Sequence, residues 1–285
     1  MRAHFDTDPT LFARCMDLID EVFPGCKQMA YDGIKYHACW NKASTPFILE
    51  DKGKVIAHVG VWPLEFLLNG KLQQSASIHG VCVKKEYRGQ GLYKQLMQEA
   101  LAYAKNITEF TILFTDKPDL YTHYNFKIIP QFDFELNTKD KIISKTDLRI
   151  LKLTKAADLT LIENLLSDHI PLSNQMSLPK EKNIFILNML RKNIYYSPSL
   201  HVIIAYEVID NHLYIQDIIS QTQYDLPDIL KLIPDRYDKI ILQFCPDKFT
   251  SHSFTPIPAK TECMMASDNF NFSGNAFRYP EPYHC

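Results

Sequence analysis

The sequence predicts an α/β protein with mixed, mostly antiparallel sheets, flanked by helices and arranged in two domains. Three observations lead to this expectation. The chain has 285 residues, a length that suits two domains better than one. Apolar runs bounded by turn signals predict strands, and segments with helical spacing lie between them. The order of expected elements in the second half resembles that in the first, which suggests a diverged duplication, although no residue repeat is visible.

The elements expected in the first half begin with a helix. Asp8 and Pro9 are typical of a helix start, apolar spacing continues to Val22, and Pro24-Gly25 ends the helix. Asn69-Gly70 is the strongest hairpin signal in the chain, and it joins expected strands at 54–68 and 71–83. The remaining expected elements are a helix at 89–105, a short helix at 119–124, and strands at 46–49, 110–115, 126–129 and 132–136.

A polar, charged run at 137–147 is the preferred domain boundary, so we expect domains at 1–140 and 141–285. The second half is predicted to contain a hairpin at 200–219 that turns at Asp210-Asn211. The tail from Ser251 is rich in Pro, Phe and Asn and is expected to be mostly irregular. The other expected elements there are strands at 148–153 and 239–245 and helices at 156–170, 180–192 and 226–232.

Composition excludes several classes of protein. Apolar residues make up 46% and charged residues 22%, as in a soluble globular protein. With 33 acidic against 31 basic residues, no general positive field would hold nucleic acid or an anionic membrane. No apolar run approaches the ~20 residues of a membrane span, and the first residues do not form a secretory signal. Seven cysteines without a C-x-x-C pair indicate reduced thiols. We therefore expect a cytoplasmic protein that binds neither nucleic acid nor membrane; its oligomeric state is unreadable.

The most informative segment runs from Ser75 to Leu96, where an expected strand passes through Arg88-Gly89-Gln90-Gly91 into an expected helix. Glycines let backbone amides approach a ligand closely, and the first amides of a helix lack internal partners. With the helix dipole, such a turn suits a pyrophosphate, and Arg88 adds a cation at its rim. An ordinary strand–turn–helix junction would also contain these glycines. G-x-G-x-x-G is not completed and no Gly-Lys-Ser/Thr follows, which disfavours a dinucleotide enzyme or a P-loop kinase.

The segment VCVKKEYRGQGLYKQLM resembles the acetyl-CoA signature of the GNAT superfamily, whose loop reads [Q/R]-x-x-G-x-[G/A] between a strand and a helix. Arg88 and Gly91 match this pattern. At the last position of the motif, where the family usually has a small residue, this sequence has Tyr93. Larger residues also occur at this position in the branch resembling enhanced-intracellular-survival acetyltransferases. The resemblance implies a strand bulge at Gly80 and a pantetheine arm paired with the backbone around Cys82, at Val81 and Val83. It also implies that the pyrophosphate of acetyl-CoA is held by amides of Gly89, Gln90, Gly91, Leu92, Tyr93 and Lys94.

A second match follows at the distance that the family requires. The segment DLYTHYNF at 119–126 resembles the family's Leu-Tyr-x-x-x-Gly-Phe, with Asn125 in place of the glycine. Asn tolerates positive φ better than most residues, so the turn can survive. Tyr121 falls on the tyrosine that protonates the leaving CoA thiolate, a role that suits a phenol near sulfur. Without the resemblance, Tyr121 would be one of 15 tyrosines, packed with its hydroxyl bonded.

The base that accepts the amine proton is less clear from the sequence. Strand positions indicate His79, Glu65 and His58 as candidates, and we place His79 with Tyr121 in the predicted catalytic set. A strand histidine is more often packed and hydrogen-bonded. In some two-domain relatives the C-terminal carboxylate reaches the active site, a role that Cys285 would take here.

Other residue types offer weaker signals. Cys82 is expected to be buried rather than to act as a nucleophile, because no partner base is evident. The histidines show no metal-ligand spacing, so we expect no metal. Trp62, Phe66 and Phe47 would line an acceptor pocket or, as is usual for aromatic residues in strands, pack in the core.

These observations predict an N-acetyltransferase of the GNAT type. It would move an acetyl group from acetyl-CoA, as co-substrate, by direct attack of a primary amine on a small molecule or protein. The alternative is a non-catalytic acyl-CoA-binding or protein-interaction module on the same fold. Because segment 219–226 contains no glycine, the second half is expected to be a diverged GNAT-like domain that shapes or caps the acceptor site. Acceptor identity and acyl chain length stay open.

Overall fold

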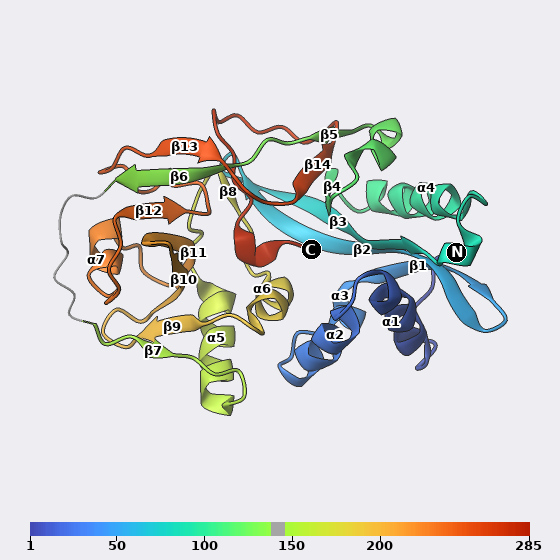
Figure 1. Cartoon of the computed structure of the whole chain (residues 1–285), viewed down its shortest axis with the longest axis horizontal. Helices are drawn as coiled ribbons and strands as arrows, with labels where there is room; N and C mark the ends of the chain where they lie inside the picture. Colours follow the sequence, from blue (N-terminus) through green and yellow to red (C-terminus); the bar gives the residue numbers. More distant parts are fainter. Residues whose placement is uncertain (138–145) are drawn as a thin grey trace.

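The computed structural model describes residues 1–137 and 146–285 and contains two seven-stranded sheets (Figure 1). The first sheet has the order β1 (Thr45–Asp51), β2 (Lys54–Leu68), β3 (Lys71–Val83), β4 (Phe110–Thr115), β14 (Cys263–Ser267), β5 (Phe126–Ile128), with β8 (Met176–Ser177) beside β2. The second has the order β13 (Thr255–Pro258), β6 (Phe132–Asn137), β12 (Lys239–Leu242), β11 (His212–Ser220), β10 (Val202–Ile209), β9 (Ile194–Ser197), β7 (Arg149–Ile150).

The two sheets repeat one pattern of strand directions. From β1 and from β9, two antiparallel pairs lead to one parallel pair, which is β3–β4 in the first sheet and β11–β12 in the second. Two further antiparallel pairs follow in each. The fifth strand of each series comes from the other half of the chain, because β14 lies between β4 and β5 and β6 lies between β12 and β13. The two halves are thus joined by an exchange of strands.

This exchange bears on one sequence-based expectation and corrects another. The preferred boundary at 140 lies among residues 138–145, outside the described residues, and the sheets do not divide there. Strand β6 precedes that position but belongs to the second sheet, and β14 follows it but belongs to the first. The expectation of a mostly irregular tail is wrong at β13 and β14. Edge and partner choice in a sheet depends on long-range packing, which a local pattern does not contain.

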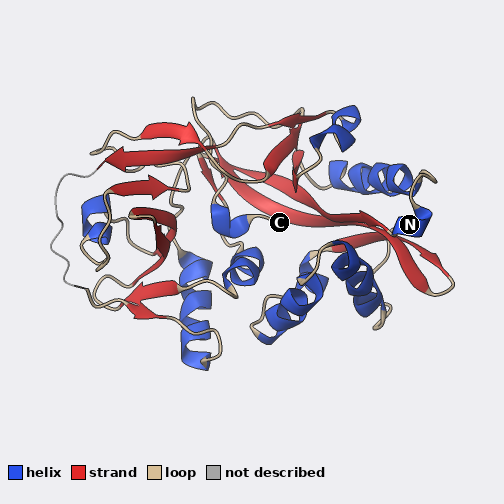
Figure 2. Cartoon of the chain, in the orientation of Figure 1, coloured by secondary structure: helices blue, strands red, loops and turns tan. Residues whose placement is uncertain are grey.

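Helices cover both faces of the first sheet (Figures 1 and 2). Helices α1 (Leu11–Val22), α2 (Cys26–Lys35) and α3 (Trp40–Ala43) lie on one face, and α4 (Leu92–Lys105) lies on the other. Nearly every residue of β2 from Val55 to Leu64 is buried, as expected for a strand covered on both sides. Helix α1 begins at Leu11 rather than Pro9, because the Thr10 N–H donates to Asp8 Oδ1 at 2.9 Å and holds the preceding turn.

The second half contributes α5 (Ala156–Asp168), α6 (Lys182–Met189) and α7 (Leu226–Leu230). Short 3-10 turns occur at η1 (Lys85–Tyr87), η2 (Pro118–Leu120), η3 (Thr122–Tyr124) and η4 (Glu281–Tyr283), so the short helix expected at 119–124 is two such turns. Asn69 and Gly70 have φ of 51° and 75°, as a type I′ hairpin requires. Across residues 1–137 and 146–285, no helix combines the length and apolar character needed to cross a bilayer.

Candidate active site

Strands β3 and β4 pair over only part of their length. They pair from Ser75 to Ser77 against residues 110–112, although β3 continues to Val83 and β4 to Thr115. Gly80, with φ of 56°, belongs to a bulge in which residues 80 and 81 lie opposite one residue of β2. The ring of His58 holds this bulge, since its Nδ1 donates to the Gly80 carbonyl at 2.8 Å. Bulges bend a strand and interrupt pairing, so β3 diverges from β4 and the sheet opens.

The end of β3 presents main-chain groups to this opening. The Lys84 N–H donates to the Ile56 carbonyl of β2 at 2.8 Å. In an antiparallel pair, the backbone N–H and C=O groups of alternate residues point towards the partner strand. The backbone groups of Cys82 therefore point towards β2, and those of Val81 and Val83 point away from it. The Val83 carbonyl accepts from Arg88 Nε at 3.1 Å. Cys82 is buried and burial raises the pKa of its thiol, as expected for a packed cysteine rather than a nucleophile.

The turn from Arg88 to Gly91 leads into α4. Gly89 and Gly91 have φ of 77° and 78°, and a Cβ at either would meet no atom within 4 Å. Glycine is therefore required at both positions by the positive φ and not by crowding, and the space beside them is open. Gly91 is the N-cap of α4 and has no side-chain cap. Within the described part of the chain no backbone N–H of residues 89–94 has an acceptor, and the first is Gln95 N–H to the Gly91 carbonyl at 3.1 Å. Such a turn suits an anion.

Tyr121 lies at the end of η2, on the α4 side of the first sheet. Its buried ring meets those of Phe126 and Tyr93 edge-to-face, with centroids 6.3 and 6.2 Å apart. Burial raises the pKa of Tyr121 to about 12, and a hydrogen bond with the Thr115 side chain opposes this shift. The phenol thus keeps its proton at neutral pH and can donate it. Asn125 has φ of 63°, so it takes the left-handed position expected of it.

Tyr93 has a structural role that the sequence did not reveal. Its hydroxyl donates to the Leu120 carbonyl at 2.8 Å, and its ring packs edge-to-face on Tyr124 at 5.9 Å. It therefore ties the first turn of α4 to the segment that carries Tyr121. The small residue usual at this position in the motif could not span this distance.

These features meet at one cavity of about 1520 Å³. Of the predicted catalytic and cofactor-binding residues, those that line it are His79, Val81, Cys82, Val83, Arg88, Gly89, Gly91, Leu92, Tyr93 and Tyr121. Side chains of Gln90 and Lys94 do not line it, although their amides belong to the open turn. The second half adds residues of α6 and, after β14, Glu281, His284 and Cys285.

The candidate bases differ in position. His79 lies in the cavity wall with Nε2 2.7 Å from Ser44 Oγ, and its buried Nδ1 has no partner among the described residues. Burial, together with neighbouring His58, lowers the pKa of His79 to about 3, so the ring is neutral at physiological pH and a weak base. His58 holds the bulge and Glu65 accepts from Gln74; neither lines the cavity.

The aromatic candidates are divided between the cavity and the core. Trp62 lines the cavity, 5.8 Å from His79 between ring centroids. Phe66 packs in the core on the α1 side of the first sheet, and Phe47 packs in the core beneath α4. No group of three or more His, Cys, Asp or Glu side chains suited to a metal ion occurs in the part of the chain that the structure describes.

Comparison with known proteins agrees with this geometry. Residues 7–129 match the family model described as an acetyltransferase (GNAT) domain. Residues 7–129 form a GNAT domain. Over 84 residues the chain is 29% identical to the uncharacterized N-acetyltransferase YhbS of Escherichia coli, a match covering 30% of this chain and 49% of that protein. The match therefore spans about half the length of this curated relative.

Solved structures extend the likeness beyond the GNAT domain. A probable N-acyltransferase from Enterococcus faecalis has a TM-score of 0.61 at 16% identity, covering 93% of this chain and 71% of that one. Eis1 from Mycobacterium abscessus has a TM-score of 0.60 at 11% identity, covering 90% of this chain and 71% of that one. At these identities the likeness is one of fold, and it includes both halves.

Proposed function

We propose that this protein is an N-acetyltransferase that moves an acetyl group from acetyl-CoA to a primary amine by direct attack. One observation carries the proposal. The open amides at the start of α4, the unpaired end of β3 and the protonated phenol of Tyr121 meet at a single cavity.

The residues present fit acetyl-CoA. The amides of residues 89–94 offer donors to a pyrophosphate, and no Cβ projects from Gly89 or Gly91 to keep it away. The backbone of Val81 and Val83 offers an extended arm the pairing that β4 does not supply. Bound in this way, the thioester would lie towards the opening between β3 and β4.

The proposed reaction is a simple acyl transfer. The amine nitrogen forms a bond to the acetyl carbonyl carbon, and the C–S bond breaks as the tetrahedral intermediate collapses. Tyr121 gives its proton to the leaving sulfur, and the proton that the nitrogen loses returns to the phenol through solvent. With its low pKa, His79 is better suited to orienting the amine than to removing a proton. The product is an amide and free CoA.

The second half is proposed to complete the acceptor site, because α6 and residues 281–285 line the same cavity. All seven cysteines are free thiols, which supports the proposal that the protein works in a reducing compartment such as the cytoplasm. The acceptor is an amine of a small molecule or a protein.

Calorimetric titration of acetyl-CoA into the wild-type protein and Arg88→Glu tests the proposal. We expect the wild-type protein to bind acetyl-CoA and Arg88→Glu to bind it more weakly. With a panel of amines, we expect the wild type to release the CoA thiol and Tyr121→Phe to release it more slowly. Binding without turnover of any amine would favour the acyl-CoA-binding module. Failure of the folded protein to bind acetyl-CoA, CoA or longer acyl-CoAs would overturn the proposal.

A further inference from the structure

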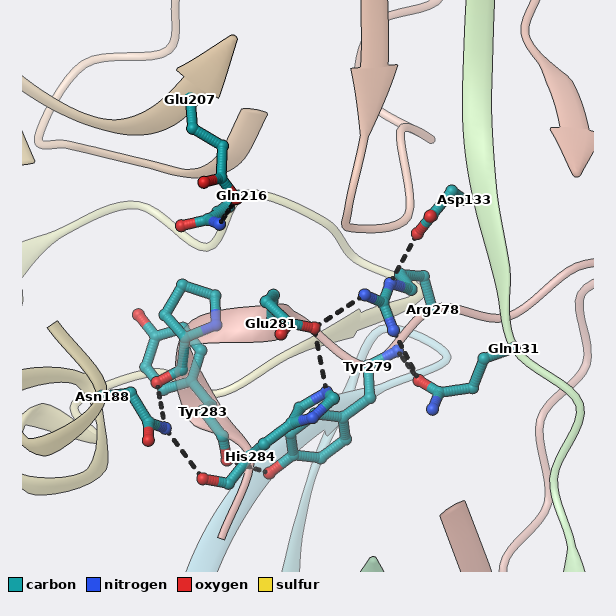
Figure 3. Close-up of polar contacts among 11 residues, drawn as sticks. Gln131, Asp133, Asn188, Glu207, Gln216, Arg278, Tyr279, Glu281, Tyr283 and His284 are labelled. Carbon is teal, nitrogen blue, oxygen red and sulfur yellow. Dashed lines mark hydrogen bonds and ion pairs between the residues drawn. The ribbon is translucent and has the colours of Figure 1, made fainter. Parts of the chain in front are cut away.

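The segment after β14 returns between the two sheets and lines the end of the cavity near α6 (Figures 1 and 3). Contacts from both sides fix its path. Asn188 of α6 donates from Nδ2 to the carbonyls of Pro282 and His284, at 3.0 and 2.8 Å. The Tyr283 hydroxyl donates to Asp217 of β11 at 2.9 Å. Side chains of this segment are therefore held in place rather than free to move.

Arg278 organises the charges here (Figure 3). Its side chain is 1% exposed, with Nε 2.9 Å from Asp133 Oδ1 and Nη2 2.8 Å from Glu281 Oε2. One guanidinium thus lies between two carboxylates. Burial alone would raise the pKa of Glu281, but the positive charges around it, among them Arg278 and Lys192, outweigh burial and lower the pKa, so this carboxylate is ionised at neutral pH.

His284 lies beside this carboxylate. Its ring stacks on Phe114 of β4, with centroids 4.2 Å apart. Its buried Nε2 is 3.7 Å from Glu281 Oε2, too far for a hydrogen bond, and has no partner within residues 1–137 and 146–285. Burial lowers the pKa of His284 to about 4, so its ring is neutral at neutral pH and one of its two nitrogens carries a lone pair. The unpartnered Nε2 and an ionised carboxylate therefore lie close together, in two residues that line the cavity.

We propose that Glu281 and His284 form the subsite that binds the amino group of the acceptor. The inference rests on the proposed N-acetyltransferase function and deepens it. A primary ammonium has three N–H donors and no acceptor, which complements two acceptors side by side. An ionised carboxylate repels an anionic group. The acceptor is therefore a primary amine that arrives as an ammonium ion, with no anionic group beside its nitrogen, and it releases one proton to solvent before the nitrogen attacks the thioester.

The position of the subsite relative to the first sheet supports this assignment. Phe114, on which His284 stacks, packs against the core that contains Trp62, on the face covered by α1. Tyr121 belongs to the core beneath α4, on the other face. The amine and the group that protonates the leaving sulfur thus reach the opening between β3 and β4 from opposite faces.

Direct binding tests the subsite without requiring turnover. The probes are 2-phenylethylamine and n-hexylamine, titrated calorimetrically into protein saturated with CoA. Glu281→Gln keeps an acceptor for Arg278 but removes the charge, and Glu262→Gln is the matched control, an exposed carboxylate lining the same cavity. We expect Glu281→Gln to weaken binding of both amines about 10- to 100-fold, because a charged hydrogen bond is lost. Glu262→Gln should change amine binding by less than about twofold. Acetyl-CoA affinity should be unchanged in both.

The outcomes separate the subsite from the proposed function. Equal amine affinity in the wild type and Glu281→Gln overturns the subsite, as does failure of the wild type to bind either amine at about 10 mM. Loss of acetyl-CoA binding by the wild type would instead overturn the proposed function. If thermal unfolding shows that Glu281→Gln does not fold, His284→Asn decides: about tenfold weaker amine binding supports the subsite, and unchanged binding removes it.

Discussion

Replacing Gly91 with alanine tests the anion-binding turn most directly. Gly91 has φ of 78° and a Cβ there would meet no atom within 4 Å, so the cost to folding is one of backbone conformation. Placing an L-residue in this region costs about 1–2 kcal/mol. The reduced freedom of the unfolded chain returns about 0.4–1 kcal/mol. We therefore expect Gly91→Ala to lower the free energy of unfolding by about 1 kcal/mol.

The expected effect on ligand binding is larger than the effect on folding. The added methyl group would project into the open space where the amides of residues 89–94 face the cavity. If it prevents one charged N–H···O bond to the pyrophosphate, about 1.5–3 kcal/mol of binding free energy is lost. The dissociation constant for acetyl-CoA then rises about 10- to 100-fold.

Gly53→Ala is the matched control. Gly53 lies in the turn between β1 and β2 with φ of 75°, a Cβ there would also meet no atom within 4 Å, and the residue does not line the cavity. Urea unfolding should show the same loss of stability in both variants, whereas calorimetry should show weaker acetyl-CoA binding in Gly91→Ala alone. Equal affinities in the two variants would refute the argument that this turn holds the pyrophosphate.

Three further predictions concern individual side chains. Tyr121→Phe should lower kcat for thiol release about 10²- to 10⁴-fold without changing acetyl-CoA affinity; an unchanged kcat would remove Tyr121 from the mechanism. Tyr93→Phe loses the hydrogen bond to the Leu120 carbonyl, so it should lower the free energy of unfolding in urea by about 1 kcal/mol and lower kcat more than it raises the acetyl-CoA KM. Wild-type stability and kinetics in this variant would contradict a role for this hydrogen bond in positioning Tyr121. Burial lowers the pKa of His58 to about 4 and of His79 to about 3 from 6.5, so their stability contribution is complete above pH 6.5 and lost as pH falls. At pH 5, each histidine should have lowered the free energy of unfolding by about 2 kcal/mol. In urea unfolding measured across this pH range, His58→Gln should lose less stability than the wild type. Equal slopes of unfolding free energy against pH in the two proteins would contradict this prediction.

Local signals in the sequence identified much of the GNAT domain. Strands β2, β3 and β4 have the predicted bounds, and the Asn69-Gly70 turn lies where expected. The same holds for the Gly89–Gly91 turn, since positive φ is a property of single residues and their neighbours. Tyr121 reaches the same cavity as this turn, so the two motifs are brought together as the resemblance implied.

The missed features depend on residues far apart in the chain. Tyr93 appeared only as a departure from a motif, but its role depends on Leu120, 27 residues away. His79 was expected as a base, yet its pKa depends on burial beneath neighbouring aromatic rings. Glu281 and His284 carry no motif, and their relevance follows from the path of their segment between the sheets.

The sequence by itself determined strands β2, β3 and β4, the GNAT turn and the tyrosine that faces it, because these depend on backbone preference and short spacing. Only the tertiary structure decided which sheet each strand joins, which residues of the second half line the cavity and which carboxylate remains charged there. Strand pairing and desolvation act between residues brought together by folding, so a linear pattern does not contain them.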